Sequence, residues 1–370
     1  MSENKIYHIL VINPGSTSTK IAVFENEKCT LSRSVFHDSS ELLKYPTIND
    51  QLNYRMHVIR QFLKDSKVDL HHIDAVVGRG GPCYACESGC YVIDEKLIED
   101  TRDVKGHFYH SSMLGVQMAY EFQQRYGGIA LMVDAPVVDE LCDEARITGV
   151  KGIYRRATAH VLNAKETARR YAASIGKTYE DLNLIVAHID GGISITAHKH
   201  GRMIDGNDAG GGEGPFTPTR MGSMAVTDVL DYLFDKEPSE VRKLCSQAGG
   251  LSSWFDTSDA PSIYYDRVRK GDKEAERVWT AMLYNCNKWI CMMAAPLQGK
   301  VDAILLTGGL LRVPGVVDYV KQGCEWIAPI TAFPGEFEHE SMVEHAIAVL
   351  DGKLTPKKYT GKPVWDGFKD

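Results

Sequence analysis

The sequence predicts an α/β protein made of two related halves. Apolar runs of strand length alternate with stretches of helical periodicity along the chain, which is typical of α/β folds. An apolar strand, a glycine turn and a second, alternating strand occur near residue 15 and again near residue 191. The chain has 370 residues, more than one compact core needs and enough for two domains. We therefore expect a duplicated domain, with the copies at residues 1–180 and 181–370.

The first half is expected to open with two strands and to continue with alternating helices and strands. Residues 7–26, YHILVINPGSTSTKIAVFEN, contain two β-rich runs around a Gly-Ser-Thr turn. Apolar residues at helical spacing give residues 50–64 one apolar face, which predicts a helix. Four further elements are expected: a strand at 74–77 before GRGG, a helix from about residue 111, a strand at 129–134 and a helix at 137–146.

The second half is expected to repeat this beginning. Residues 182–201, LNLIVAHIDGGISITAHKHG, again give an apolar run, a glycine turn and an alternating run. The polar segment from residue 355 onward is expected to be an exposed extension. The remaining elements are a long helix at 272–297, a strand within 301–310, a helix at 315–326, and a last helix at 341–350 that is a candidate to pack back on the first domain.

Composition and charge exclude several classes of protein. The 42 Lys and Arg against 49 Asp and Glu give a formal charge of −7, so no nucleic-acid partner is expected. The nearest approach to a membrane span, residues 281–297, is interrupted by Asn285, Asn287 and Lys288, so no membrane partner is expected either. The N-terminal segment lacks the basic head and apolar core of a secretion signal, and we expect a cytoplasmic protein.

Nine cysteines in a chain of this class are expected to be reduced. Cys83, Cys86 and Cys90 form one cluster, which could in principle bind a metal or act as a redox pair. No second CxxC or nearby His supplies a fourth ligand, and an ordinary loop is the preferred interpretation.

The turn NPGSTSTK at residues 13–20 is the leading candidate for phosphate binding. A Walker A loop needs a Gly before its Lys and a helix after it, whereas here Thr19 precedes Lys20 and a strand follows. The pattern predicts a strand–turn–strand element whose backbone N–H groups, with Ser16 and Ser18, surround a phosphate. Lys20 would add a cation. A plain polar hairpin is the alternative.

Two further glycine turns follow predicted strands. They are HIDGG at residues 188–192 and TGGL at residues 307–310. One such turn is a weak signal, but three at strand ends far apart in the sequence suggest a nucleotide held between two domains.

Phosphoryl transfer also needs cations around the migrating group and carboxylates that bind magnesium. Arg79 in GRGG and Arg220 in GPFTPTRMG lie in loops bounded by Gly and Pro, where the guanidinium can reach a carboxylate or phosphate. Asp134 ends an apolar strand, where α/β sheets usually present ligands. The alternatives are solvated surface arginines and a helix N-cap.

Six motifs together resemble the acetate kinase family, and within it the butyrate kinases, over residues 8–350. They are VINPGSTSTK, GRGG, VDAPVVDEL, LIVAH-x-x-GG, GEGPFTP and VDAILLTGG. The resemblance implies two duplicated ribonuclease-H-like domains of the actin-like ATPase superfamily, with an active site in the cleft between them. It implies reversible phosphorylation of a short-chain carboxylic acid by ATP and Mg²⁺, giving an acyl phosphate and ADP. It also implies a homodimer or larger homo-oligomer.

The resemblance implies roles for individual residues. Four would be catalytic at the migrating phosphoryl group: Arg79, Asp134, His160 and Arg220. The acid would be bound by Arg79, His110 and Arg220. Mg²⁺ would be bound by Asp134 and Glu340, with Glu338 and Glu344 close enough to compete in the alignment. The nucleotide would be bound by Asn13, Ser16, Ser18, Lys20, His188, Gly191, Gly192, Gly308 and Gly309.

The chain departs from the family pattern at several places. Asp190 stands in the second phosphate turn, where butyrate kinases typically read His-Met-Gly-Gly-Gly, and a carboxylate there repels phosphate unless it binds magnesium or points away. CYACESGC at residues 83–90 replaces an apolar, Pro/Gly-rich stretch beside the expected acid pocket. Met113 and Met221 replace small polar residues near the site.

These departures leave two interpretations open. One is a kinase with a shifted preference for a branched, longer or aromatic acid. The other is a nucleotide-binding protein that retains the fold, has weak or no kinase activity and acts in regulation or assembly. We favour the kinase, because Lys20, Arg79, Asp134 and Arg220 are all retained. A sugar kinase would use Asp134 as a general base, but the arginine pair fits a carboxylate better.

Overall fold

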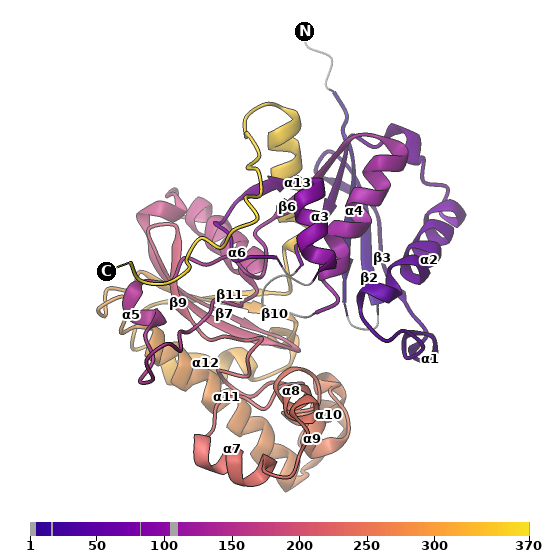
Figure 1. The fold of residues 1–370 in the computed structure, drawn as a ribbon. Coiled ribbons are helices and arrows are strands. Elements are labelled where there is room, and N and C mark those ends of the chain that lie inside the picture. Colours follow the sequence, from indigo (N-terminus) through magenta and orange to yellow (C-terminus); the bar gives the residue numbers. More distant parts are fainter. Residues whose placement is uncertain (1–4, 16–17, 82, 104–109, 370) are drawn as a thin grey trace. The chain divides into compact units, whose positions relative to one another are not determined.

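The computed structural model describes residues 5–15, 18–81, 83–103 and 110–369 (Figure 1). The chain forms two compact units. Unit 1 comprises residues 1–139 and 338–370, and unit 2 comprises residues 140–337. The boundary at residue 180 stays a prediction, because compact units and duplicated copies are different divisions of a chain.

Unit 1 contains a six-stranded sheet of order β3-β2-β1-β4-β6-β5. The first three strands form an antiparallel meander, β4 and β6 run parallel to β1, and β5 is antiparallel to β6. The strands are β1 (His8–Pro14), β2 (Ser18–Glu25), β3 (Lys28–Phe36), β4 (Ala75–Gly78), β5 (Cys90–Val92) and β6 (Ile129–Val133).

Two helices pack on the centre of this sheet. Both α4 (Met113–Tyr126) and α13 (Glu338–Leu350) contact β1, β4 and β6. A Cβ on Gly78, at the end of β4, would lie 2.2 Å from the carbonyl oxygen of Gly115 in α4. The close approach of this strand end to α4 therefore requires glycine at position 78. The other helices of unit 1 are α1 (Ser39–Leu42), α2 (Leu52–Asp65) and α3 (Glu95–Arg102).

The sheet of unit 2 repeats the strand order of the first. Its order, β9-β8-β7-β10-β11, matches β3-β2-β1-β4-β6 strand for strand. The directions match too: an antiparallel meander, then two strands parallel to the central one. The predicted duplicated α/β fold is therefore confirmed. The strands are β7 (Asn183–Ile189), β8 (Ile193–Lys199), β9 (Arg202–Gly206), β10 (Ala303–Gly308) and β11 (Ile330–Pro334).

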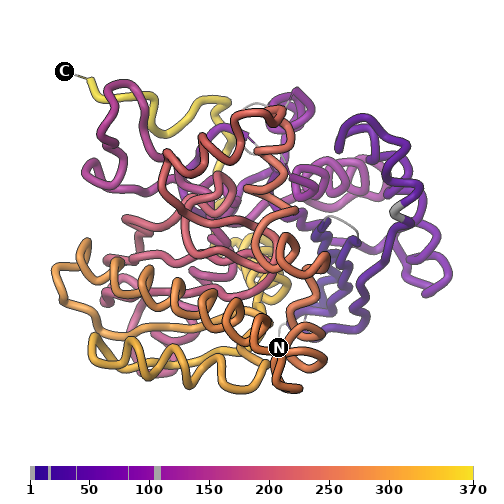
Figure 2. The backbone as a smooth tube through the Cα atoms, turned by 90° about the horizontal axis from the view of Figure 1, so that it is seen from below, coloured from indigo at the N-terminus to yellow at the C-terminus, as the bar shows by residue number. Residues whose placement is uncertain are grey.

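In unit 2, α6 (Val161–Ser174) contacts β7 and β10, and the long helix α11 (Lys273–Met293) contacts β7 and β8. The apolar stripe of α11 is buried in the core of the unit. Figure 2 shows α11, in orange, with α12 (Val316–Cys324) beside it. Five further helices are α5 (Asp143–Arg146), α7 (Val226–Leu233), α8 (Pro238–Ser246), α9 (Leu251–Phe255) and α10 (Ala260–Asp266).

One expectation about a single segment was wrong and another was incomplete. Of the helix predicted at 137–146, the structure forms only α5, because the backbone before it pairs with Cys86: Cys86 N–H donates to Val137 O and Asp139 N–H to Cys86 O. The tail is not simply an exposed extension. Tyr359 is buried and its hydroxyl accepts from Tyr84 N–H (2.9 Å).

Among the residues that the structure describes, no helix has the length and apolar character needed to cross a membrane. All nine cysteines lie in the described part of the chain, and all are free thiols. Cys83, Cys86 and Cys90 are buried. A hydrogen bond with Cys86 raises the pKa of Cys83, and burial raises the pKa of Cys90 to about 12. Metal ligation and redox chemistry need the thiolate, so these environments agree with an ordinary loop.

Candidate active site

The first predicted phosphate turn connects β1 and β2 as a hairpin. Asn13 lies opposite Lys20, and Gly15 N–H donates to Ser18 O across the turn (2.7 Å). Asn13 is buried, Ser18 is partly buried and Lys20 is exposed. Ser16 lies outside the described residues. The predicted strand–turn–strand element, with a strand rather than a helix after Lys20, is confirmed.

A buried arginine supports this turn from α2. Arg55 is 1% exposed, and its Nη1 donates to the carbonyl oxygen of Gly15 (2.8 Å). Its Nε and Nη2 donate to Gln51 Oε1. Burial lowers the pKa of Arg55 to about 10. Nothing in the sequence pattern distinguished Arg55 from the exposed cations of the same helix.

Arg79 follows β4 and forms an ion pair with Glu338, a carboxylate from the C-terminal part of the chain. Glu338 is buried at the start of α13; its Oε1 lies 3.0 Å from Arg79 Nη2 and its Oε2 accepts from Asn13 Nδ2 (2.7 Å). The structure thus brings Glu338 to the predicted site residues. Glu340 and Glu344 are exposed on the same helix.

The helical period explains this choice of carboxylate. Glu338 lies one turn before Met342 and two before Ala346, both buried, so it shares the face that packs on the sheet. Glu340 lies about 200° further round the helix and faces solvent. The apolar periodicity of the last helix could have identified Glu338, had the helix been started three residues earlier.

Asp134 ends β6 in an unusual backbone conformation. Its φ of 40° is in the left-handed region, where non-glycine residues are uncommon and Asp is tolerated better than most. Its Oδ1 accepts from Ser88 Oγ (2.6 Å) and from Gly89 N–H (2.8 Å). The carboxylate is therefore buried and oriented by the loop containing the cysteine cluster, and it caps no helix. Sequence reasoning missed Ser88 and Gly89.

His110 precedes α4. Its Nδ1 accepts from the backbone N–H of Ser112 (3.1 Å), so this nitrogen carries a lone pair and Nε2 carries the proton of the neutral ring. The ring is partly buried. His110 therefore presents a hydrogen-bond donor at Nε2, which suits an anionic substrate.

In unit 2, the second glycine turn gathers two histidines and an arginine. The rings of His160 and His188 are stacked, with centroids 4.0 Å apart and planes 18° apart. His160 Nδ1 lies 2.7 Å from Ser194 Oγ. A Cβ on Gly192 would lie 2.8 Å from Arg220 Nη1 and 3.0 Å from His160 Cε1. Glycine at position 192 therefore lets the side chains of Arg220 and His160 approach the turn closely.

The loop that carries Arg220 is hydrogen-bonded to the same turn. The hydroxyls of Thr217 and Thr219 both donate to the carbonyl oxygen of Gly191, at 2.9 and 3.1 Å. Arg220 N–H donates to Thr217 Oγ1 (3.0 Å). These bonds fix the position of Arg220 relative to Gly191 and Gly192. The two threonines were not predicted.

Asp190 occupies backbone donors of two glycine turns at once. Its Oδ1 accepts from Gly191 N–H (2.7 Å) and its Oδ2 from Gly309 N–H (2.6 Å). Gly308 has a φ of 107°, and a Cβ there would lie 2.3 Å from Ile189 O. The HIDGG and TGGL turns therefore lie against each other, with the carboxylate binding donors of the kind that hold phosphates.

His188, Asp190 and Glu336 each offer a ligand atom within 4.8 Å of one another. Glu336 follows β11, and its Oε1 lies 3.9 Å from His188 Nε2. The sequence did not point to this group, because Glu336 is far along the chain.

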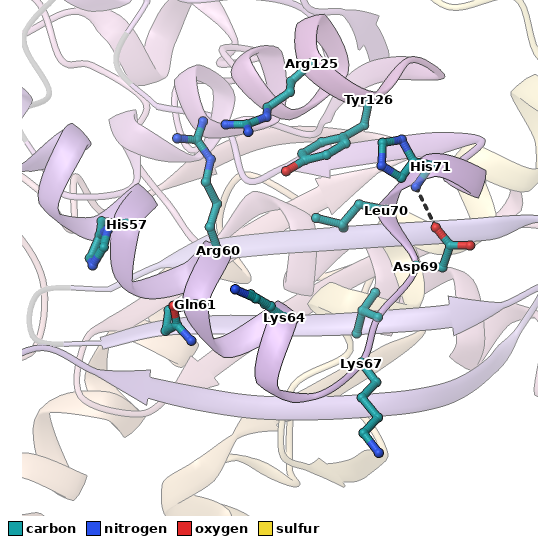
Figure 3. Close-up of a pocket in the computed structure, with 11 residues that line it drawn as sticks. His57, Arg60, Gln61, Lys64, Lys67, Asp69, Leu70, His71, Arg125 and Tyr126 are labelled. Atoms are coloured by element: carbon teal, nitrogen blue, oxygen red, sulfur yellow. Dashed lines mark hydrogen bonds between the residues drawn. The ribbon is translucent and has the colours of Figure 1, made fainter.

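A separate cavity of about 470 Å³ lies on unit 1, between α2 and the loop after it (Figure 3). Arg60 is paired with Glu121 (3.2 Å), and the guanidinium of Arg125 lies 5.5 Å from the Tyr126 ring centre. None of the described site residues predicted from the sequence lines this cavity. It is therefore a different feature from the candidate site.

Comparisons with known proteins identify the family and the fold of the chain. A family model described as the acetokinase family matches residues 146–314. Two proteins named probable butyrate kinase, from Clostridium botulinum strains Alaska E43 / Type E3 and Eklund 17B / Type B, are 43% and 42% identical over 356 residues. Each alignment covers 95% of this chain and 99% of the relative.

Solved structures are similar in fold. The acetate kinase of Porphyromonas gingivalis gives a TM-score of 0.74 at 17% identity, covering 93% of this chain and all of that one. A propionate kinase from Francisella tularensis subsp. tularensis SCHU S4 gives a TM-score of 0.70 at 17% identity, covering 92% and 98%. With relatives above 40% identity along nearly its whole length, the chain belongs to the acetokinase family.

Proposed function

We propose that the protein is an ATP-dependent kinase that phosphorylates a short-chain carboxylic acid, butyrate or a branched or longer relative, to an acyl phosphate. The observation that carries the proposal is the 43% identity, over 95% of the chain, to a protein named probable butyrate kinase. The retained charged residues support it, because Arg79 and Asp134 are held by buried or backbone partners. The non-catalytic alternative is not favoured.

The proposed reaction is a direct in-line transfer. A carboxylate oxygen attacks the γ-phosphorus, the bond from that phosphorus to the β–γ bridging oxygen breaks, and ADP leaves with the electron pair. The acid is ionised at neutral pH, so no general base is needed. The protein must instead reduce the repulsion between two anions and align them. We assign this task to Arg79, Arg220, His110 and His160.

The residues present fit Mg²⁺, which prefers oxygen ligands and stays partly hydrated. Asp134 offers a buried carboxylate oriented by two hydrogen bonds, and Glu338 offers a second buried carboxylate held by Asn13. We propose Asp134 and Glu338 as the magnesium carboxylates, with Glu338 in place of Glu340. When bound, the ion would neutralise charge on the nucleotide phosphates.

The nucleotide phosphates are assigned to the glycine turns. The first turn would contribute its backbone N–H groups with Asn13, Ser18 and Lys20, and the predicted Ser16 stays a proposal. The second would contribute His188, Gly191 and Gly192, together with Gly308 and Gly309. Because Asp190 accepts from Gly191 and Gly309, a phosphate would compete with this carboxylate for two donors.

The proposal is tested by acyl-phosphate formation from Mg-ATP, trapped as hydroxamates, with acetate, propionate, butyrate, isobutyrate, isovalerate and phenylacetate. Turnover with butyrate or a branched relative is expected, and the ranking of acids reports on the pocket. Arg79→Gln should abolish it, whereas Lys64→Gln, a cation of the separate cavity on the same unit, should not. No turnover with any acid by the folded protein would favour the regulatory alternative.

We also propose a cytoplasmic homodimer or larger homo-oligomer. Nine free thiols support a reducing compartment. Light scattering of the purified protein measures the number of subunits, and a monomeric mass would contradict the proposal.

A further inference from the structure

Asn163 is a buried amide that joins the strand ends of the second phosphate turn. It lies in the first turn of α6 and is 0% exposed. Its Nδ2 lies 2.8 Å from His188 Nδ1 and donates to Thr307 Oγ1 (3.1 Å), and its Oδ1 accepts from Phe337 N–H (2.9 Å). Its three partners come from the end of β7, the end of β10 and the segment after β11.

Two of these partners fix which way the amide points. A backbone N–H only donates, so Phe337 requires the oxygen of Asn163 on its side. Thr307 has one hydroxyl proton, which it donates to Gly335 O (2.9 Å), so towards Asn163 its oxygen accepts. Both constraints place the NH₂ group towards His188. A flipped amide would set its NH₂ group against the N–H of Phe337 and its oxygen against the accepting oxygen of Thr307.

The amide in turn fixes the tautomer of His188. An NH₂ group only donates, so Nδ1 of His188 must accept and carries the lone pair. In the neutral ring the proton is then on Nε2. His160 differs in this respect. Its Nδ1 faces the hydroxyl of Ser194, which can donate or accept, so this hydrogen bond does not determine the tautomer of His160.

We infer that Asn163 is a positioning residue that holds His188 as the Nε2–H tautomer, so that the second turn presents an imidazole N–H donor to a phosphate group. Assigning that phosphate to a nucleotide rests on the proposed function. The assignment of the His188 tautomer does not depend on the proposed function. The same assignment excludes His188 as a metal ligand in the wild-type protein, because both nitrogens are engaged: one accepts from Asn163 and the other bears the proton.

This tautomer gives the cluster of His188, Asp190 and Glu336 a definite chemistry. With Nε2 as a lone pair, the three groups would form the His–carboxylate set that binds transition metals. With Nε2–H, the imidazole is a donor beside two carboxylates, and it attracts an anion without adding a full positive charge 4.0 Å from the stacked ring of His160.

The test is the tautomer of His188 in the ¹⁵N-labelled full-length protein, read from long-range ¹H–¹⁵N correlations and assigned by the signals lost in His188→Gln. The inference requires a protonated Nε2 and an unprotonated Nδ1 near neutral pH. Thr307→Val keeps the amide and should leave this pattern unchanged. A wild-type Nδ1–H tautomer would overturn the inference, whether or not the protein is an active kinase.

Asn163→Asp provides the reversed case. A carboxylate only accepts, so it should draw the proton to Nδ1 and leave a lone pair on Nε2. We expect this variant to bind Co²⁺, with visible absorption bands that disappear when His188→Gln is added, and the wild type to show none. The KM for ATP should rise about tenfold while the KM for the acid changes little. Co²⁺ bands in the wild type that depend on His188 would contradict the inference. Should Asn163→Asp not fold, the wild-type tautomer alone decides.

Discussion

The β1–β2 turn and the β7–β8 turn occupy equivalent places in two sheets of the same strand order, yet their charged neighbours differ. In the first, the carbonyl oxygen of Gly15 accepts from the buried guanidinium of Arg55, and Lys20 follows the turn. In the second, the carboxylate of Asp190 accepts from Gly191 and Gly309. A cation thus supports one turn, and an internal anion occupies the other.

The difference shows that two turns in the same topology can have charged neighbours of opposite sign. Each turn also has one carboxylate close by, and the two are placed differently. Glu338 accepts from the side-chain amide of Asn13, whereas Asp190 accepts from backbone N–H groups of Gly191 and Gly309. We therefore expect the carboxylate at the first turn to assist catalysis and the one at the second to compete with phosphate.

The largest effect is expected at the first turn. Glu338→Gln should lower kcat about 100-fold, because it removes a charge assigned to magnesium and the partner of Arg79. Glu340→Gln, two residues further along the same helix and exposed, is the matched control and should change kcat less than about twofold. Equal losses in the two variants would contradict the assignment of Glu338.

The supporting cation of the first turn is expected to be essential for stability. Arg55→Met leaves the carbonyl oxygen of Gly15 and the amide of Gln51 without their buried donor, which should cost about 2–3 kcal/mol of unfolding free energy. Urea unfolding measures the loss. Arg60→Met, in the same helix but paired with Glu121 near the surface, should cost no more than about 1 kcal/mol.

Each half of the chain also contains a buried histidine with a lowered pKa, and both should make the folded protein less stable at low pH. Burial lowers the pKa of His37, next to Thr19, to about 4, and that of His198 in β8 to about 3, from 6.5. Below pH 6.5 the unfolded chain binds the proton first, so stability is lost as the pH falls towards these values. At pH 5 the loss should be about 2 kcal/mol for each histidine.

Urea unfolding at pH 7 and pH 5 tests this dependence on pH. His37→Gln should remove the part due to His37 and leave the part due to His198. A dependence that is the same in the wild type and in His37→Gln would show that this histidine binds its proton normally.

The smallest effect is expected at the second turn. Asp190→Gly frees the N–H groups of Gly191 and Gly309 and should lower the KM for ATP about threefold to tenfold. Asp190→Asn keeps one acceptor oxygen, so its KM for ATP should lie between those of the wild type and Asp190→Gly. Steady-state kinetics at saturating acid measure the change. A raised KM would show instead that Asp190 helps to bind magnesium.

Local sequence patterns predicted most of the fold. Apolar runs and glycine turns indicated both hairpins and their duplication, because a strand's periodicity and a turn's residues are encoded within a few positions. The prediction of a helix over the whole of 137–146 was wrong, because backbone hydrogen bonds with Cys86, about 50 residues earlier, override local helix propensity. Tyr359 was placed in an exposed tail for the same reason: its partner, Tyr84, is distant in sequence.

For the candidate site, residue types were predictable and partnerships were not. Arg79, Asp134, His160 and Arg220 stood out by type and by motif. To identify Glu338 from the sequence, the start of the last helix had to be predicted to within one turn. The exact end of a helix is its least predictable property. The link from Asp190 to Gly309 depends on two strands more than 100 residues apart lying side by side, which no local pattern encodes.

The two units differ in the order in which their residues are synthesised: unit 2 is one continuous range of the chain, and unit 1 is two ranges. Residues 140–337 emerge as one continuous stretch and can fold while synthesis continues, whereas unit 1 needs its last segment, residues 338–370. That segment brings Glu338 to Asn13, and its Lys357 pairs through the backbone with Cys90 and Val92, the strand that follows Asp134's loop partners. The contacts of the N-terminal unit, although its sheet is made first, are therefore completed only after residues 338–370 have been synthesised.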